Sequence, residues 1–157
     1  MSSSEPASSL EDRIRHVLAE HNVPFEAFEH PPVYTNPTMA DALGVKPADT
    51  IKNICMVTKE GEAILVLVPG DARIDSKKIA AAAGTSRVSF ADEKTVLEKV
   101  GCPIGCVPPF DHAQPLRVFM DRALLRKQFL YFNPGVHVKS FKIPAFHLRK
   151  LTNAGLV

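Results

Sequence analysis

Hydrophobic positions along the chain follow two periods, one typical of helices and one typical of strands. Leu10, Ile14, Val17 and Leu18 recur at the spacing of one helix face, which predicts a helix over 10–21. Shorter apolar or alternating runs, bounded by Gly, Pro and Asn, predict strands. The predicted strands cover 25–29, 51–58, 63–68, 87–90, 116–121, 129–132 and 136–141.

Helix signals lie between several of these strands. Asp75 and Asp92 can each cap the start of a helix, and a glycine follows each apolar segment as a stop. Pro144 suits the first position of a last helix. The predicted helices cover 38–43, 75–83, 92–100 and 144–151, with a helical turn at 122–126 and a Gly- and Pro-rich loop at 101–114.

Short strands and short helices therefore interleave without a strict βαβ period. That pattern predicts an α+β fold with a mixed six-stranded curved sheet or barrel, flanked by the helices. With 157 residues and no internal repeat, we expect one domain over 10–157 and a disordered, Ser-rich lead-in over 1–9. No apolar run approaches the ~20 residues that span a bilayer, so we expect no membrane association and a cytoplasmic location.

Composition narrows the function only slightly. The formal net charge of +2 neither requires nor excludes an RNA partner, because phosphate binding needs only a local basic patch. Cys102 and Cys106 have CxxxC spacing, but Cys55 is the only other cysteine and a structural zinc site usually has four ligands. We therefore expect reduced thiols and no metal.

The motifs of familiar hydrolases and nucleotide-binding enzymes are absent from the sequence. It contains no GxSxG, HExxH, GxxxxGK[ST] or strand-linked GxGxxG. A catalyst built from this chain would have to work by positioning its substrate and water, without a side-chain nucleophile.

Three segments could nevertheless carry chemistry. Residues 50–53 place Lys52 in an apolar strand, residues 67–71 end a strand in Pro-Gly-Asp, and residues 101–110 combine Gly and Pro in one loop. A buried lysine needs an anionic partner, and a stiff glycine loop can present amides to an oxyanion. Each segment also has a structural interpretation: a snorkelling lysine, a tight turn and a rigid loop.

Several short motifs lie in a fixed order across residues 10–155. They are Lys52-Asn53, Leu65-Val66-Leu67-Val68-Pro69-Gly70-Asp71 with Asp75-Ser76-Lys77-Lys78-Ile79, Gly101-Cys102-Pro103-Ile104-Gly105-Cys106-Val107-Pro108-Pro109-Phe110, Val118-Phe119-Met120-Asp121 with Leu124-Leu125, Asn133-Pro134-Gly135 and Leu148-Arg149-Lys150-Leu151-Thr152. Each motif alone is weak, but the ordered set resembles the YbaK family, which includes the domain associated with prolyl-tRNA synthetases and its free-standing relatives.

The resemblance implies an α+β fold around a mixed six-stranded barrel and hydrolysis of mischarged aminoacyl-tRNA, usually tRNA(Pro) carrying Ala or Cys, without metal or cofactor. The family's functional lysine corresponds to Lys52, with Asn53 beside it, and its functional glycine to Gly105. His137 is the candidate for a polar residue after the Asn-Pro-Gly turn. The resemblance also implies substrate contacts from Gly70, Asp71, Gly101, Val107, Pro108, Pro109, Phe110, Asn133 and Gly135.

The expected partners are the acceptor end of an aminoacyl-tRNA and, as a further candidate, prolyl-tRNA synthetase. We expect Met56, Val68 and Phe110 to line a pocket for a small amino-acid side chain. One alternative is a non-catalytic module that binds a tRNA end, a nucleotide or a partner protein. Another is a fragment of a longer synthetase, although the polar N-terminus and the end just past a helix favour a free-standing chain.

Overall fold

The computed structural model describes residues 9–110, 112 and 114–157. The predicted lead-in over 1–8 lies outside the described residues. Ser9, the last residue of the predicted lead-in, is instead the cap of the first helix, because its hydroxyl oxygen accepts a hydrogen bond from Asp12 N at 3.1 Å.

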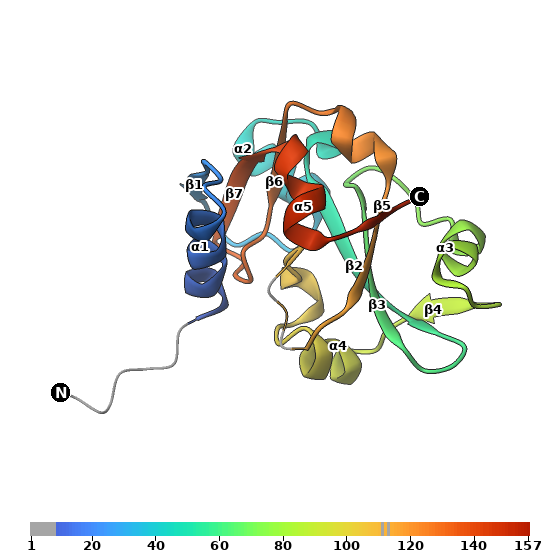
Figure 1. The fold of residues 1–157 in the computed structure, drawn as a ribbon. Coiled ribbons are helices and arrows are strands. Elements are labelled where there is room, and N and C mark those ends of the chain that lie inside the picture. The colour runs from blue at the N-terminus through green and yellow to red at the C-terminus, as the bar shows by residue number, and fades with distance from the viewer. Residues whose placement is uncertain (1–8, 111, 113) are drawn as a thin grey trace.

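The described strands form two sheets (Figure 1). The first is antiparallel, in the order β1-β7-β6, and contains β1 (Glu26–Glu29), β7 (Lys139–Pro144) and β6 (Phe129–Phe132). The second has the order β4-β2-β3-β5-β8 and contains β4 (Val88–Phe90), β2 (Ile51–Thr58), β3 (Ala63–Pro69), β5 (Arg117–Met120) and β8 (Gly155–Leu156). This second sheet is mixed, since β3, β5 and β8 run parallel while β2 runs antiparallel to β3 and β4.

Helices surround the two sheets. The α-helices are α1 (Leu10–Glu20), α2 (Asn36–Leu43), α3 (Ser76–Ala83), α4 (Glu93–Lys99) and α5 (Leu148–Thr152). The 3₁₀ turns are η1 (Pro47–Asp49), η2 (Ile104–Cys106), η3 (Arg122–Arg126) and η4 (Ala145–His147). Among the residues described, none of these helices is long and apolar enough to cross a membrane.

Hydrophobic side chains bury both faces of β3, whose residues are all buried. On one face Leu65 and Leu67 join a large cluster that fills the space between the sheets, α1 and α5. On the other face Ile64 and Val66 join a smaller cluster under α3, together with Met56 of β2. The alternation of the two strands thus gives the second sheet two separate cores.

Helix α1 is held against the first sheet by both apolar and charged contacts. Its residues Ile14 and Leu18 are fully buried. The guanidinium of Arg15 lies 4.8 Å from the centroid of the Phe141 ring, and Lys139 Nζ donates to the Glu11 carboxylate at 3.1 Å. Figure 1 shows α1 beside β1 and β7, on the side away from α3.

The predicted α+β class is confirmed, but the single six-stranded sheet is replaced by two sheets. Among the described residues the barrel does not close, because one isolated parallel bridge, between Thr50 and Tyr131, is the pairing that connects the sheets. Sheet order depends on long-range pairing, which hydrophobic periodicity does not reveal.

The strand predicted over 136–141 is displaced in the structure to β7. Val136 N donates to the Asn133 side chain at 2.8 Å, and the carbonyl oxygens of His137 and Val138 accept from Val33 N and His30 N. The bond between His30 and Val138 continues the β1–β7 register for one more residue, whereas the bonds of Val136 and His137 do not follow that register. The strand begins only at Lys139, where β1 and β6 lie on either side of it.

One exposed ion pair gives a pH-dependent prediction for stability. Arg117 donates to both carboxylate oxygens of Glu62 at 2.7 Å, and these hydrogen bonds hold the pKa of Glu62 below its ordinary value. A lowered pKa means that the stabilisation is present above the unfolded pKa, about 4.3, and is lost as the pH falls through the folded value.

Replacing Glu62 with glutamine should therefore lower the free energy of unfolding at pH 7 by at most about 1 kcal/mol, because both side chains are roughly half exposed. The difference from the parent protein, measured by urea denaturation, should shrink as the pH falls below about 4. Glu98→Gln, on an exposed part of α4, is the control, and its free energy of unfolding should match that of the parent protein at every pH. A difference that grows in acid would contradict this account of the pair.

Candidate active site

A cavity of about 380 Å³ opens where α2, the start of β2 and the loop around η2 meet. Apolar and polar groups both line it. The lining residues are Val33, Tyr34, Thr35, Asn36, Pro37, Met39, Ile51, Lys52, Asn53, Ile54, Gly70, Ile104, Gly105, Val107 and Asn133.

The first turn of α2 forms one wall, and its sequence explains its geometry. Thr35 caps the helix, and a reciprocal capping box links Thr35 and Thr38. The Nδ2 group of Asn36 donates to Thr50 Oγ1 and to the Ile51 carbonyl oxygen, both at 3.0 Å. These two bonds attach the start of α2 to the start of β2.

Gly70 lies where the backbone after β3 passes closest to this junction. Its N–H donates to Thr50 O at 2.9 Å. A methyl group at position 70 would overlap Thr50 Oγ1 and would lie 2.5 Å from the carbonyl oxygen of Pro47. Only glycine fits there, because the neighbours are backbone and a buried hydroxyl that itself donates to Pro47 O at 2.7 Å.

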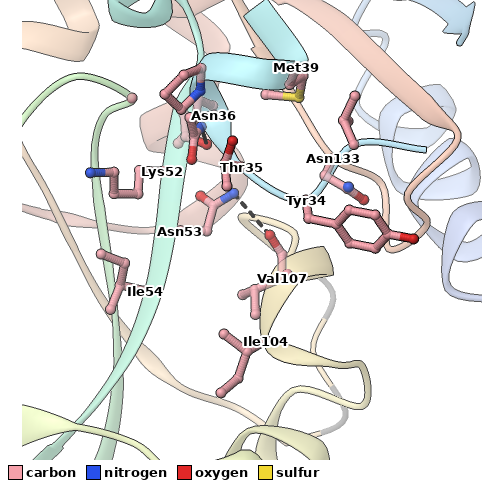
Figure 2. Close-up of a pocket in the computed structure, with 15 residues that line it drawn as sticks. Tyr34, Thr35, Asn36, Met39, Lys52, Asn53, Ile54, Ile104, Val107 and Asn133 are labelled. Carbon is pink, nitrogen blue, oxygen red and sulfur yellow. Dashed lines mark hydrogen bonds between the residues drawn. The ribbon is translucent and has the colours of Figure 1, made fainter. Parts of the chain in front are cut away.

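Lys52 and Asn53 leave β2 on opposite faces, as strand alternation predicts (Figure 2). The Nζ of Lys52 donates to the carbonyl oxygen of Ala72 at 2.8 Å, so the half-buried ammonium is anchored to the turn that follows β3. The Nδ2 of Asn53 donates in the other direction, to Val107 O at 3.0 Å. The two side chains reach the cavity from different sides of the strand.

Within the described structure, the side-chain oxygen of Asn53 is an unsatisfied hydrogen-bond acceptor. Its Oδ1 is buried and makes no hydrogen bond with any described residue. A buried acceptor left unsatisfied costs about 1–3 kcal/mol. Because Asn53 lines the cavity, a ligand that donates an O–H or N–H could satisfy this oxygen.

Gly105 and His137 meet at the edge of the cavity. A methyl group at Gly105 would lie 3.1 Å from His137 Cε1, so the loop approaches the imidazole closely. The Nδ1 of His137 donates to Val33 O at 3.1 Å, and its ring lies 4.4 Å from the Tyr34 ring centroid. His137 therefore supports residues of the lining without lining the cavity itself.

The structure gathers one group of the predicted site residues and separates another. The residues that line the cavity are Lys52, Asn53, Gly70, Gly105, Val107 and Asn133. Those outside the lining are Asp71, Gly101, Pro108, Pro109, Phe110, Gly135 and His137.

Most of the predicted site residues outside the cavity lining lie in turns, in a second cavity or on the surface. Gly101 follows α4 with φ 93°, and Gly135 has φ 97° and packs against Leu10, so both occupy turns that favour glycine. Pro109 and Phe110 line a second cavity. Asp71 is exposed, and Pro108 is buried and accepts a hydrogen bond from His112 at 2.7 Å.

The pocket expected from Met56, Val68 and Phe110 does not form. Met56 and Val68 belong to the core under α3, whereas Phe110 packs against Phe132 in the other core, with 5.7 Å between ring centroids. The face of β2 that carries Met56 is opposite the face that carries Asn53. The apolar residues of the lining are Val33, Pro37, Met39, Ile51, Ile54, Ile104 and Val107, of which Val33, Met39, Ile51 and Val107 are buried.

Of the residues that the structure describes, those that line the cavity include no Cys, His, Asp or Glu. Cys55 is buried, and burial raises the pKa of its thiol, which disfavours the nucleophilic thiolate. Within the described ranges, no three His, Cys, Asp or Glu side chains gather as a metal site would require.

The fold and cavity define an α+β domain with a preformed site that offers a ligand one cation, one unpartnered acceptor and an apolar wall. Comparison with known proteins identifies this class more closely. The chain belongs to the aminoacyl-tRNA editing domain family, whose model matches residues 30–151.

Relatives of known description agree with this membership. A proline–tRNA ligase of Stenotrophomonas maltophilia is 32% identical over 125 residues, which cover 76% of this chain and 22% of the ligase. The ligase of Xanthomonas axonopodis pv. citri is 34% identical over 84 residues, 54% of this chain and 15% of the ligase. The chain thus spans about a fifth or less of these ligases.

Two solved structures share the fold. A candidate trans-editing enzyme for prolyl-tRNA synthetase has a TM-score of 0.83 and 27% identity, with 97% of each chain covered. A hypothetical protein has a TM-score of 0.85 at 23% identity, covering 92% of this chain and 96% of that one.

Sequence reasoning missed the wall formed by Tyr34, Thr35, Asn36 and Met39. The segment before α2 contains two prolines and predicts only a break between elements. A capping signal was present in Thr35 and Thr38, but it marks a helix start and carries no information about a ligand.

Proposed function

We propose that this chain hydrolyses the ester of mischarged aminoacyl-tRNA, with alanyl- or cysteinyl-tRNA(Pro) as the substrate. Family membership and the likeness to proline–tRNA ligases support this reaction and this tRNA. In this proposal the cavity at α2 holds the acylated terminal adenosine, and prolyl-tRNA synthetase is the enzyme whose errors supply the substrate.

The unpartnered Oδ1 of Asn53 is the observation that carries the assignment of the site. An aminoacylated ribose has two donors of the right kind, the hydroxyl next to the ester and the α-ammonium group. Either one would satisfy this acceptor, and the α-ammonium group is the donor that deacylated tRNA lacks. The cavity also has the volume typical of small-ligand sites.

The reaction needs little from the protein beyond positioning. Water attacks the acyl carbon, the bond between that carbon and the ribose oxygen breaks, and a proton goes to the ribose oxygen, giving free amino acid and tRNA. Negative charge develops on the carbonyl oxygen, which preorganised donors stabilise. Lys52, fixed by Ala72 O, is the cation that lines the cavity, and Gly105 lets the η2 loop approach the ester.

Lys52→Ala should lower kcat/KM for deacylation by roughly tenfold or more, because one partly desolvated cation is lost from the site. The measurement is release of labelled alanine from Ala-tRNA(Pro), with Cys- and Pro-tRNA(Pro) run in parallel. Lys94→Ala, an exposed lysine on α4, is the charge-matched control and should match the parent protein.

The outcomes separate the competing functions. Hydrolysis of Ala- or Cys-tRNA(Pro) with a slower Lys52→Ala variant supports the proposal. Equal rates for Lys52→Ala and Lys94→Ala would refute the assignment of the site. Binding of tRNA without turnover of any of the three substrates would instead indicate a non-catalytic binding module.

A further inference from the structure

Tyr34 is an aromatic residue that the fold leaves open at the rim of the cavity. It exposes 66% of its surface although it lies among the lining residues. The chain position is well fixed, since Val33 precedes it with a buried side chain and Thr35 follows it as the cap of α2. Water therefore covers most of a ring whose backbone cannot move far.

The ring is supported from one side. The His137 ring lies 4.4 Å away between centroids, tilted by 48°. His137 is fixed in turn, because its Nδ1 donates to Val33 O at 3.1 Å and its carbonyl oxygen accepts from Val33 N at 3.0 Å. The pair presents an aromatic surface whose position is set before any ligand arrives.

The lining changes in chemical kind from the Tyr34 side of the cavity to the Lys52 side. Ile104, 49% exposed, is a second apolar group of the lining. In the view of Figure 2, Asn53 lies between Lys52 on the left and Tyr34 on the right. A flat apolar end, a hydrogen-bonding middle and a cationic end match the base, the sugar and the phosphate of a nucleotide.

We propose that Tyr34 is the stacking surface for the terminal nucleobase of the RNA substrate, an inference that rests on the proposed function. Aromatic side chains bind bases through their π-faces, and this binding tolerates an open, hydrated site. An aliphatic amino-acid side chain is instead selected by buried walls. Val33, Met39 and Ile51 are buried, so the acyl group belongs against them and the base against Tyr34.

The binding experiment uses the two tyrosines of the chain as separate probes. Protein labelled with 3-fluorotyrosine gives one fluorine NMR signal for each, and a Tyr131→Phe variant identifies the signal of Tyr34. Adenosine monophosphate should shift the Tyr34 signal in a saturable way and leave that of Tyr131 in place. Ribose 5-phosphate, which lacks the base, should shift it much less. Equal shifts with both compounds would overturn the proposal.

The kinetic experiment compares three substitutions at one position. Tyr34→Ala and Tyr34→Leu should raise KM for aminoacyl-tRNA roughly tenfold with kcat within about threefold, because neither offers a flat ring. Tyr34→Phe keeps the ring and should stay within about threefold of the parent KM. Tyr131 lies outside the cavity lining, so Tyr131→Phe is the control and should have the kcat and KM of the parent protein. A leucine variant as good as the phenylalanine variant would contradict stacking.

The two proposals fail in different ways. If adenosine monophosphate shifts the Tyr34 signal but no aminoacyl-tRNA is hydrolysed, base stacking stands and the editing function is refuted. If deacylation proceeds and Tyr34→Ala has the parent KM, the editing function stands and base stacking is refuted.

Discussion

Replacing Gly70 with alanine should destabilise the protein by about 3 kcal/mol or more, a large part of the total stability of a domain of this size. The added methyl group would overlap Thr50 Oγ1 and press on the carbonyl oxygen of Pro47. Neither neighbour can move away easily. Thr50 is fully buried and bonded to Pro47 and Asn36, and its carbonyl oxygen accepts from Gly70 itself.

Urea denaturation followed by circular dichroism measures this loss. Gly155→Ala is the matched control, because a methyl group there would meet Phe119 Cδ1 at an ordinary 3.6 Å, and we expect a change below about 1 kcal/mol. Combining Gly70→Ala with Thr50→Ala removes one overlap and keeps the one with Pro47 O, so it should restore stability only in part. A Gly70→Ala variant as stable as the control would contradict the close approach.

Asn53→Leu should lower kcat/KM for deacylation roughly 100- to 1,000-fold, the usual effect of removing one preorganised hydrogen-bonding group from a reaction site. Stability should hardly change, within about 1 kcal/mol. The variant loses the bond from Nδ2 to Val107 O, but it also removes the buried Oδ1 that has no partner, and leucine fills a similar volume.

A second variant separates binding from packing. Asn53→Ala should be as inactive as Asn53→Leu but less stable, because it leaves an unfilled space. Both quantities come from the same preparations, by deacylation kinetics and by denaturation. An active leucine variant would show that the carboxamide oxygen has no role in the reaction. A strongly destabilised leucine variant would show that the bond from Nδ2 to Val107 O has a structural role.

Several elements could be read from the sequence because strong local signals bound them. The strand predicted over 51–58 has the same bounds as β2, and the segments 122–126 and 129–132 agree with η3 and β6. Helix α2 instead begins at Asn36, two residues before the predicted start, because the Thr35 cap precedes the apolar positions. The short strand β8 was not predicted, because it forms only by pairing with distant β5.

Part of the site could be predicted, because some motifs fix where their side chains lie. Lys52 and Asn53 are adjacent on one strand, so alternation alone places them on opposite faces. Gly70 and Gly105 came from the family resemblance, and both lie at close approaches in the structure. Tyr34 and Asn36 could not be found, because their part in the cavity depends on how α2 docks onto β2.

Thr50 connects the junction of the two sheets to the wall of the cavity. In the described part of the chain, the isolated bridge from Thr50 to Tyr131 joins the two sheets, and the bonds of Asn36 and Gly70 to Thr50 converge on the same point. Asn36 and Gly70 both line the neighbouring cavity, so part of its wall is attached at the point where the two sheets meet. The shape of that wall therefore depends on the same few hydrogen bonds that hold the sheets in register at Thr50.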